Sequence, residues 1–336
     1  MVMRLSRFLL TTVWLIFCFS WQPLLAKQKE VRRAQPADRN KLDSSVATPD
    51  PLGSRNALEN SRAGAVSSIA LTPSSLAALA MYPSTAPVTV ASSAIMIDGR
   101  TGSVIFFKNP DARRPVASTQ KLLTGLLVAE HGGLDGRVRV LAADCAVEPT
   151  KLGVKPGETY TKRQLLAAMM VHSCNDAAVC LARNDAGSVE GFARLMNSKA
   201  LLLGAANSRF LNPNGLPKSG QFSTARDMAR IAYAAYHNST LREYMRLPGL
   251  IFTYSSGRQR FLEPTNKLVM RSAIFNGMKT GYTDASGRCL VSSASVRGRE
   301  IILVQLGGTH HTLWDDAERL LLWGLESSSS AFATTN

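Results

Sequence analysis

The sequence predicts an α+β fold in which one antiparallel sheet is flanked by helices and interrupted by an inserted all-helical lobe. Three observations predict it. A strand pair opens a region that begins at residue 91, a second strand pair and an amphipathic helix close it near residue 326, and the long segment between them has helical periodicity. We expect the strand pairs from the two ends to join one sheet.

The strand pairs are recognised by short apolar runs on either side of a turn. Residues 91–98 and 103–108 flank Gly99-Arg100-Thr101-Gly102, and residues 289–296 and 300–306 flank Arg297-Gly298. The closing helix places five apolar side chains along one face: Leu313, Ala317, Leu320, Leu321 and Leu325.

The middle of the chain reads as a series of helices. We expect them over residues 118–131, 162–170, 177–183, 191–203 and 224–237. Gly204 follows the fourth as a C-terminal cap, and Thr224-Ala225-Arg226-Asp227 resembles a capping box at the start of the fifth.

The first 90 residues differ from the rest. Residues 1–26 have two arginines, an apolar run of about 14 residues and a final Leu24-Leu25-Ala26, which is typical of a secretory signal peptide. Because Leu24 is not small, an uncleaved N-terminal anchor is the alternative. Residues 27–90 are polar and aperiodic, which predicts a flexible linker, and residues 327–336 predict a disordered tail. We therefore expect an exported protein of the periplasmic or cell-wall space, with any membrane attachment at the N-terminus.

Charge and cysteines narrow the function classes. The net charge of +15 is spread along the chain without a basic stripe, which disfavours nucleic-acid binding and suits an anionic cell-wall polymer. No cysteine or histidine spacing typical of a metal site appears, and no cofactor motif is present. Beyond Cys18 in the leader, we expect the cysteines to be small buried thiols: Cys145, Cys174, Cys180 and Cys289.

Three short motifs occur in a fixed order, and together they indicate a serine acyl-transferase. They are Ser118-Thr119-Gln120-Lys121, Ser173-Cys174-Asn175 and Lys279-Thr280-Gly281. Each motif alone is common in helix caps and strand edges, so only the combination carries the prediction.

The first motif supplies a nucleophile and a base. A serine hydroxyl near neutral pH needs a base within hydrogen-bond reach. If Ser118 lies in the first turn of a helix, Lys121 shares its face three residues on. Lys121 acts as that base only if its pKa falls from about 10.4 toward 7–8, through burial and the neighbouring cation Lys279.

The other two motifs supply a proton relay and a carboxylate clamp. Ser173 lies where one helix ends and another begins, so its hydroxyl could pass a proton to a leaving amine while the Asn175 amide holds a substrate backbone. On a strand edge, Lys279 and Thr280 would place a cation and a hydroxyl beside a substrate carboxylate, and Gly281 would allow close approach of the ligand.

With these residues, the chain resembles the D-Ala-D-Ala carboxypeptidases of serine peptidase family S11, the low-molecular-mass penicillin-binding proteins. The resemblance covers residues 91 to about 326. It includes Ile97-Asp98, Asn175-Asp176-Ala177-Ala178, Asn212-Pro213-Asn214-Gly215-Leu216, Thr265-Asn266-Lys267-Leu268 and Gly277-Met278-Lys279-Thr280-Gly281-Tyr282-Thr283. It implies a β-lactamase/transpeptidase-like fold, peptidoglycan stem peptides as substrates and β-lactam antibiotics as acylating inhibitors.

The resemblance also implies residue roles. Ser118 is the expected nucleophile, Lys121 the base and Ser173 the proton relay, with the backbone N–H groups of Ser118 and Tyr282 as the oxyanion hole. The expected substrate-binding residues are Asn175, Lys267, Lys279, Thr280, Gly281, Tyr282 and Thr283. One departure is Thr309-His310-His311, where some members have an arginine that helps to hold the carboxylate.

Three alternatives remain beside the carboxypeptidase. A class A β-lactamase needs a glutamate that activates the deacylating water, and no glutamate occurs between Glu190 and Glu243, so we expect stable acylation by penicillin. A D,D-endopeptidase would cut cross-links with the same residues. A wall-binding protein on an inactive scaffold is disfavoured by the intact Ser118, Lys121 and Lys279.

Overall fold

The computed structural model describes residues 86–310 and 312–330. The predicted signal peptide and nearly all of the predicted linker lie outside the described residues. None of the described helices has both the length and the apolar character needed to cross a membrane. The fold begins before residue 91, because buried Thr89 donates a hydrogen bond of 3.1 Å to Asp316 and accepts one of 3.0 Å from Gln305.

Five strands form one antiparallel sheet in the order β2-β1-β9-β8-β7. Their bounds are β1 Ser93–Asp98, β2 Val104–Lys108, β7 Phe275–Thr283, β8 Gly287–Val296 and β9 Arg299–Gly308. The first strand pair thus lies directly against the last strand, which confirms the sheet predicted from both ends. The Lys279-Thr280-Gly281 motif lies on β7, an edge of the sheet, as expected.

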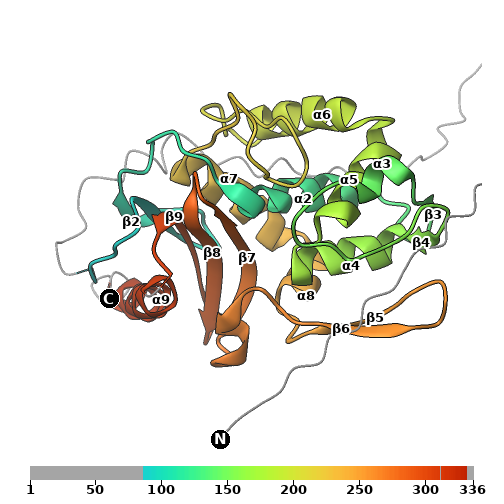
Figure 1. Ribbon diagram of the computed structural model, residues 1–336. Helices are drawn as coiled ribbons and strands as arrows, with labels where there is room; N and C mark the ends of the chain where they lie inside the picture. The colour runs from blue at the N-terminus through green and yellow to red at the C-terminus, as the bar shows by residue number, and fades with distance from the viewer. Residues whose placement is uncertain (1–85, 311, 331–336) are drawn as a thin grey trace, which may run out of the picture. The chain divides into compact units, whose positions relative to one another are not determined.

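Helices cover both faces of the sheet (Figure 1). On one face, α9 (Leu313–Ser330) packs on β8 and β9. On the other, α7 (Ala225–His237) packs on β1 and β9, and the 3₁₀ turn η2 (Ala117–Gln120) packs on β7. α9 continues to Ser330, whereas the sequence placed the start of the tail at residue 327. Serines lower helix propensity slightly but do not end a helix as glycine or proline does.

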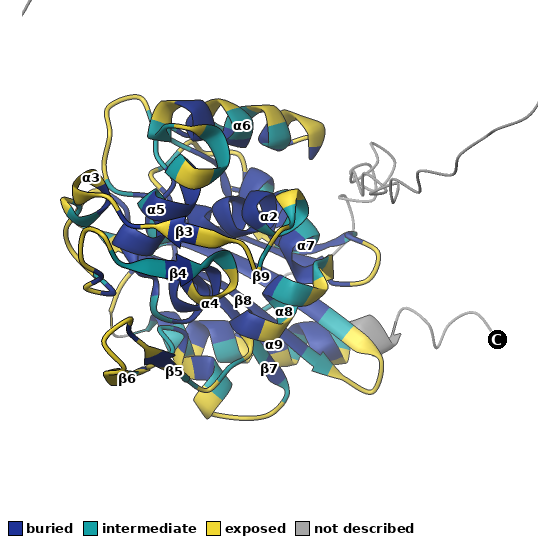
Figure 2. Ribbon diagram, turned by 90° about the vertical axis from the view of Figure 1, so that its right-hand side faces the viewer, coloured by how far each residue is buried: buried dark blue, intermediate teal, exposed yellow. Residues whose placement is uncertain are grey.

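The inserted lobe is helical, as predicted. It contains α2 (Lys121–His131), α3 (Ala142–Cys145), α4 (Lys162–His172), α5 (Asn175–Ala186), α6 (Val189–Leu202) and α8 (Ser239–Met245). Gly204 adopts a left-handed φ of 74° just after α6, which confirms the predicted cap. Thr224 caps α7 by accepting a hydrogen bond of 3.0 Å from the Asp227 N–H, but the reciprocal half of the predicted capping box is missing because the Asp227 carboxylate bonds to Ser208 and Arg230. The buried residues concentrate where the lobe meets the sheet (Figure 2).

Two small hairpins and a 3₁₀ turn had no clear sequence pattern. The hairpins pair β3 (Arg137–Arg139) with β4 (Thr159–Thr161) and β5 (Leu250–Thr253) with β6 (Gln259–Leu262); the turn is η3 (Lys267–Met270). The strands have only three or four residues each, too few to establish an alternating pattern.

Candidate active site

Ser118 lies in η2, and the chain continues from this turn directly into α2 at Lys121. The predicted helix therefore begins with a 3₁₀ turn, yet serine and lysine still share a face. Lys121 Nζ lies 2.8 Å from Ser118 Oγ, 2.6 Å from Asn175 Oδ1 and 2.6 Å from the Asn214 carbonyl oxygen. The Lys121 side chain is fully buried. Every polar contact of the amine is thus to a neutral oxygen, and one is the hydroxyl of Ser118.

Burial lowers the pKa of Lys121 well below its usual value, and the positive charge of Lys279 lowers it further. These are the two causes expected from the sequence. Asp176 acts in the opposite direction, since its negative charge favours the protonated amine. Lys121 is therefore suited to accept a proton from Ser118.

Lys279 and Ser173 form a second pair. Lys279 Nζ donates hydrogen bonds of 2.8 Å to Ser173 Oγ and 3.0 Å to the Thr280 carbonyl. Burial lowers the pKa of Lys279 to about 7. Ser173 lies between α4 and α5, while the neighbouring Cys174 is buried and its thiol pKa is raised to about 12 by burial. The hydroxyl of Ser173 can thus exchange protons with a lysine that titrates near neutrality.

All three motifs contain or adjoin a non-glycine residue with a left-handed backbone. The φ angles are 48° at Ala117, 67° at Ser173 and 96° at Met278. Such conformations cost about 1–3 kcal/mol each and are retained where the surrounding structure requires them. The strain lies at Ser173 itself and directly before Ser118 and Lys279.

Two glycines enclose the backbone of Ser118. A Cβ at Gly281 or at Gly215 would lie 2.8 Å from the amide nitrogen of Ser118. A Cβ at Gly215 would also lie 2.0 Å from the carbonyl oxygen of Ala117. β7 and the loop that contains Gly215 therefore approach Ser118 more closely than any other residue type would allow.

A cleft of about 470 Å³ opens beside Ser118. Ser118, Ser173, Thr280, Gly281, Tyr282 and the exposed Lys267 all line it, whereas Lys121, Asn175 and Lys279 lie beneath them in the buried hydrogen-bond network. Thr283 lies instead in a neighbouring hollow. Apart from Thr283, the structure thus brings the predicted site residues together around one serine.

The sequence lacks the arginine that helps some family members to hold the substrate carboxylate, but other basic side chains line this cleft. His310 lines it, and so does Arg288 of β8, whose guanidinium lies 4.4 Å from the ring centre of Tyr282. His311 lies outside the described residues. Arg288 therefore supplies a positive side chain to the cleft without an arginine after β9.

Two residues that hold the site together had no role assigned from the sequence. The carbonyl oxygen of Asn214 accepts a hydrogen bond from Lys121 and lies 3.2 Å from Ser118 Oγ. The buried carboxylate of Asp176 accepts hydrogen bonds from the backbone N–H groups of Leu152 and Gly153, at 2.9 and 2.8 Å. Both belong to stretches that carry the family resemblance, but a carbonyl acceptor leaves no trace in side-chain type.

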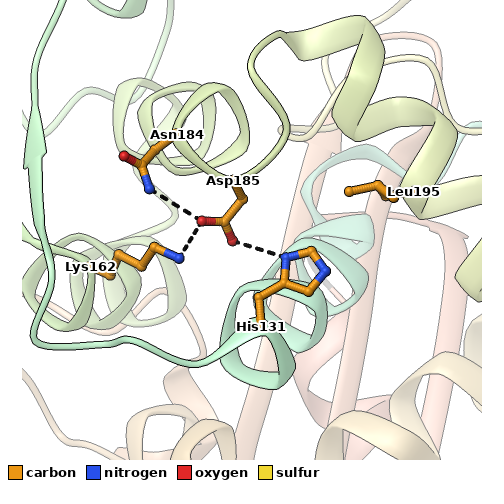
Figure 3. Close-up of a pocket in the computed structure, with 5 residues that line it drawn as sticks. All are labelled: His131, Lys162, Asn184, Asp185 and Leu195. Carbon is orange, nitrogen blue, oxygen red and sulfur yellow. Dashed lines mark hydrogen bonds and ion pairs between the residues drawn. The ribbon is translucent and has the colours of Figure 1, made fainter. Parts of the chain in front are cut away.

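A separate hollow of about 500 Å³ lies at the far side of the lobe (Figure 3). In it, Asp185 of α5 forms ion pairs with Lys162 at the start of α4 and with His131 at the end of α2, and accepts a hydrogen bond of 3.3 Å from Asn184. The Asp185 side chain is 1% exposed. This cluster joins three helix ends and contains no nucleophile.

The cysteines and potential metal ligands can be assessed only within the described residues. There Cys145, Cys174, Cys180 and Cys289 are free thiols, of which Cys145 is partly exposed and the others are buried. In the same residues, no three His, Cys, Asp or Glu side chains gather into a metal site.

Comparison with known proteins gives one family. The family model described as D-alanyl-D-alanine carboxypeptidase, peptidase family S11, matches residues 81–310. The D-alanyl-D-alanine carboxypeptidase DacB2 of Mycobacterium tuberculosis is 34% identical over 245 residues, which are 70% of this chain and 83% of that protein. The D-alanyl-D-alanine endopeptidase of Escherichia coli is 31% identical over 254 residues, 70% and 78% of the two chains. The chain spans only 58% of the carboxypeptidase DacF of Bacillus subtilis.

Solved structures agree in fold. A D-alanyl-D-alanine carboxypeptidase from Mycobacterium tuberculosis matches with a TM-score of 0.69 and 31% identity, over 74% of this chain and 95% of that chain. The carboxypeptidase DacD from Francisella tularensis matches with a TM-score of 0.67 and 28% identity, over 74% and 72%. The predicted fold class is confirmed.

Proposed function

Since the chain belongs to the D-alanyl-D-alanine carboxypeptidase family of serine peptidases, we propose that it removes the terminal D-Ala from peptidoglycan stem peptides through an acyl-enzyme on Ser118. The proposal rests above all on the surroundings of Lys121. A neutral amine has two N–H groups, which Asn175 Oδ1 and the Asn214 carbonyl accept, and its lone pair then faces Ser118 Oγ at 2.8 Å.

In the acylation step, Ser118 Oγ bonds to the carbonyl carbon of the penultimate D-Ala while Lys121 takes the hydroxyl proton. The N–H groups of Ser118 and Tyr282 receive the negative oxygen. The C–N bond then breaks as Ser173 gives its proton to the departing amine of D-Ala; Ser173 regains a proton from Lys279, to which it is hydrogen-bonded, and the proton that Lys121 took restores Lys279. In the hydrolysis step, water bonds to the ester carbonyl carbon and gives a proton to Lys121, which passes it to Ser118 Oγ as the ester C–O bond breaks.

Substrate positioning falls to the cleft. Thr280, with Lys279 beneath it, holds the terminal carboxylate, assisted by the cations that line the cleft, which include Lys267 and Arg288. Asn175 aligns the amine of Lys121, and the exposed edge of β7 at Gly281 and Tyr282 offers backbone groups to an extended peptide. A β-lactam enters the same cleft and acylates Ser118.

A D,D-endopeptidase is the second candidate, because relatives of similar identity carry that name. The two activities share every step above and differ in whether the leaving amine belongs to free D-Ala or to a cross-linked second stem. Both act on the cell wall. We further propose that residues 1–26 direct export and that any attachment to the cytoplasmic membrane is N-terminal. The N-terminal sequence of the exported protein tests this, since cleavage would leave Lys27 as the first residue.

The full chain and its Ser118→Ala variant test the reaction. Each is incubated with an acyl-D-Ala-D-Ala peptide and with purified cross-linked muropeptides, and its intact mass is recorded after benzylpenicillin. We expect D-Ala release and a penicilloyl adduct, both lost in the variant. An adduct with cleavage of cross-links alone would favour the endopeptidase, and the absence of both adduct and cleavage would refute an acylating serine.

A further inference from the structure

The hollow that Thr283 lines has a volume of about 310 Å³ and lies next to Ser118, separate from the main cleft. Its walls are formed by residues 115–117, which directly precede Ser118, by the loop of residues 215–221, and by Thr283 and Ala285 at the end of β7. The lining residues are Pro115, Val116, Ala117, Gly215, Pro217, Lys218, Ser219, Gln221, Thr283 and Ala285. Nothing in the proposed reaction uses this space, although Ala117 directly precedes the reacting serine.

The proposed function fixes which part of a substrate would reach the hollow. The terminal carboxylate lies toward Lys279 and Thr280, and the reacting carbonyl lies at Ser118, beside Gly281. The peptide therefore runs antiparallel to β7, and its upstream residues point toward Thr283. Because a strand advances about 3.3 Å per residue, the residue before the two D-Ala residues lies at this end of β7.

The rim of the hollow is positively charged. Lys218 is exposed, and its ammonium forms no ion pair with any residue from 86 to 310 or 312 to 330. The guanidinium of Arg209 lies beside Gly220 on the same loop and is likewise without an ion pair among those residues. The carboxylate of the adjacent Asp284 is exposed, accepts a hydrogen bond of 2.8 Å from the hydroxyl of Tyr282 and places one negative charge beside these two cations.

We propose that this hollow receives the side chain of the third stem residue and that Lys218 favours a side chain whose end carries a carboxylate beside its ammonium, as in diaminopimelate, over one that ends in an ammonium alone. Ser219 is exposed and uncharged, and the other polar lining groups are already hydrogen-bonded. Gln221 Oε1 accepts two backbone hydrogen bonds, and Thr283 Oγ1 bonds to Ser286. Lys218 is thus the group left to recognise charge, and it would repel the ammonium of a lysine at the same position.

Matched peptides test the inference, which rests on the proposed function. Stem peptides with diaminopimelate or its carboxamide as third residue differ in one charge, and N-acetyl-D-Ala-D-Ala lacks that residue. We expect the full chain to prefer the carboxylate roughly three- to fivefold in kcat/KM for D-Ala release, the effect of a partly exposed ion pair. Lys218→Ala should lower only the rate with diaminopimelate. Arg194→Ala, which removes one exposed charge on α6, should preserve the preference.

Equal rates for the two stem peptides would overturn the proposal, as would a Lys218→Ala variant that slows all three peptides alike. N-acetyl-D-Ala-D-Ala turnover and penicillin acylation report the proposed function separately. If no peptide is hydrolysed, the same selectivity is read from how strongly each stem peptide slows benzylpenicillin acylation of Ser118. A preference for the carboxamide in that competition would equally contradict the role of Lys218.

Discussion

Lys279 Nζ donates a hydrogen bond of 2.8 Å to Ser173 Oγ, and within residues 86–310 and 312–330 no carboxylate is bonded to this amine. The lysine is fully buried, and its pKa is lowered to about 7 by burial. An unfolded chain would hold the proton up to about pH 10.4. Between these values the unfolded state binds more protons than the folded state, so this lysine makes stability rise with pH; below pH 7 its contribution is constant.

The first prediction follows for Lys279→Met. In the wild-type protein, Lys279 should increase the free energy of unfolding by roughly 1.4 kcal/mol per pH unit between about pH 7 and 9. The variant should lack this increase. The variant should also be the more stable protein at pH 6, although it loses D-Ala release. Denaturant unfolding of both proteins at pH 6, 7, 8 and 9 measures this. If the free energies of unfolding of the two proteins change with pH in parallel, Lys279 is not the source of the pH dependence.

The second prediction concerns Gly215, whose φ is 86°. Alanine at this position would place its Cβ 2.0 Å from the carbonyl oxygen of Ala117, so the segment that contains Ser118 must move. A displacement near 1 Å at a nucleophile costs roughly 100-fold in rate. We expect Gly215→Ala to lower the rate constant of benzylpenicillin acylation by about that factor.

Gly257 provides the matched control. It has a φ of 82° in the β5–β6 turn, and a Cβ there would meet nothing within 4 Å. Gly257→Ala therefore pays only the cost of a left-handed alanine, about 1 kcal/mol. It should acylate at the wild-type rate. Equal loss of rate in both variants would assign the effect to backbone strain in general and not to contact with Ser118.

Much of the site could be predicted because its chemistry depends on side-chain type. Four side chains could be identified because each has a reactive group and lies within a recognisable motif: Ser118, Lys121, Ser173 and Lys279. The apolar strand pairs identified the sheet. The positive φ of Ala117 could not be predicted, because alanine has no preference for that conformation and only packing against Gly215 and Gly281 imposes it.

The third prediction concerns Asp176, which fixes the loop beside the cleft. The carboxylate accepts the N–H groups of Leu152 and Gly153, and the Pro149 carbonyl of the same loop accepts a hydrogen bond of 2.6 Å from the Asn175 amide. Its charge also raises the pKa of Lys121. Asp176→Asn should therefore slow acylation and also shift its pH dependence.

The direction of the shift separates the two effects. Without the negative charge, the pKa of Lys121 falls further, so the rising limb of the acylation rate should move to lower pH. Loss of loop order alone would reduce the rate at every pH by the same factor. The rate constant of benzylpenicillin acylation from pH 5 to 9 measures both, and a limb that stays in place would exclude the electrostatic role.

The last prediction separates stability from chemistry. Asp185 joins the ends of α2, α4 and α5, and its removal leaves the ammonium of Lys162, 14% exposed, without its carboxylate. Breaking a buried pair costs about 3–5 kcal/mol, and the partial exposure of Lys162 reduces this to roughly 2 kcal/mol. Asp185→Asn should therefore lower the melting temperature by roughly 4–8 °C, while the folded variant still acylates with benzylpenicillin at the wild-type rate.

Asp135→Asn is the matched control. Asp135 pairs with Arg163 but is 82% exposed, so this substitution should leave the melting temperature nearly unchanged. A lower acylation rate in the folded Asp185→Asn variant would mean that this cluster also influences the position of Ser118 through α2 and does not only stabilise the helical lobe.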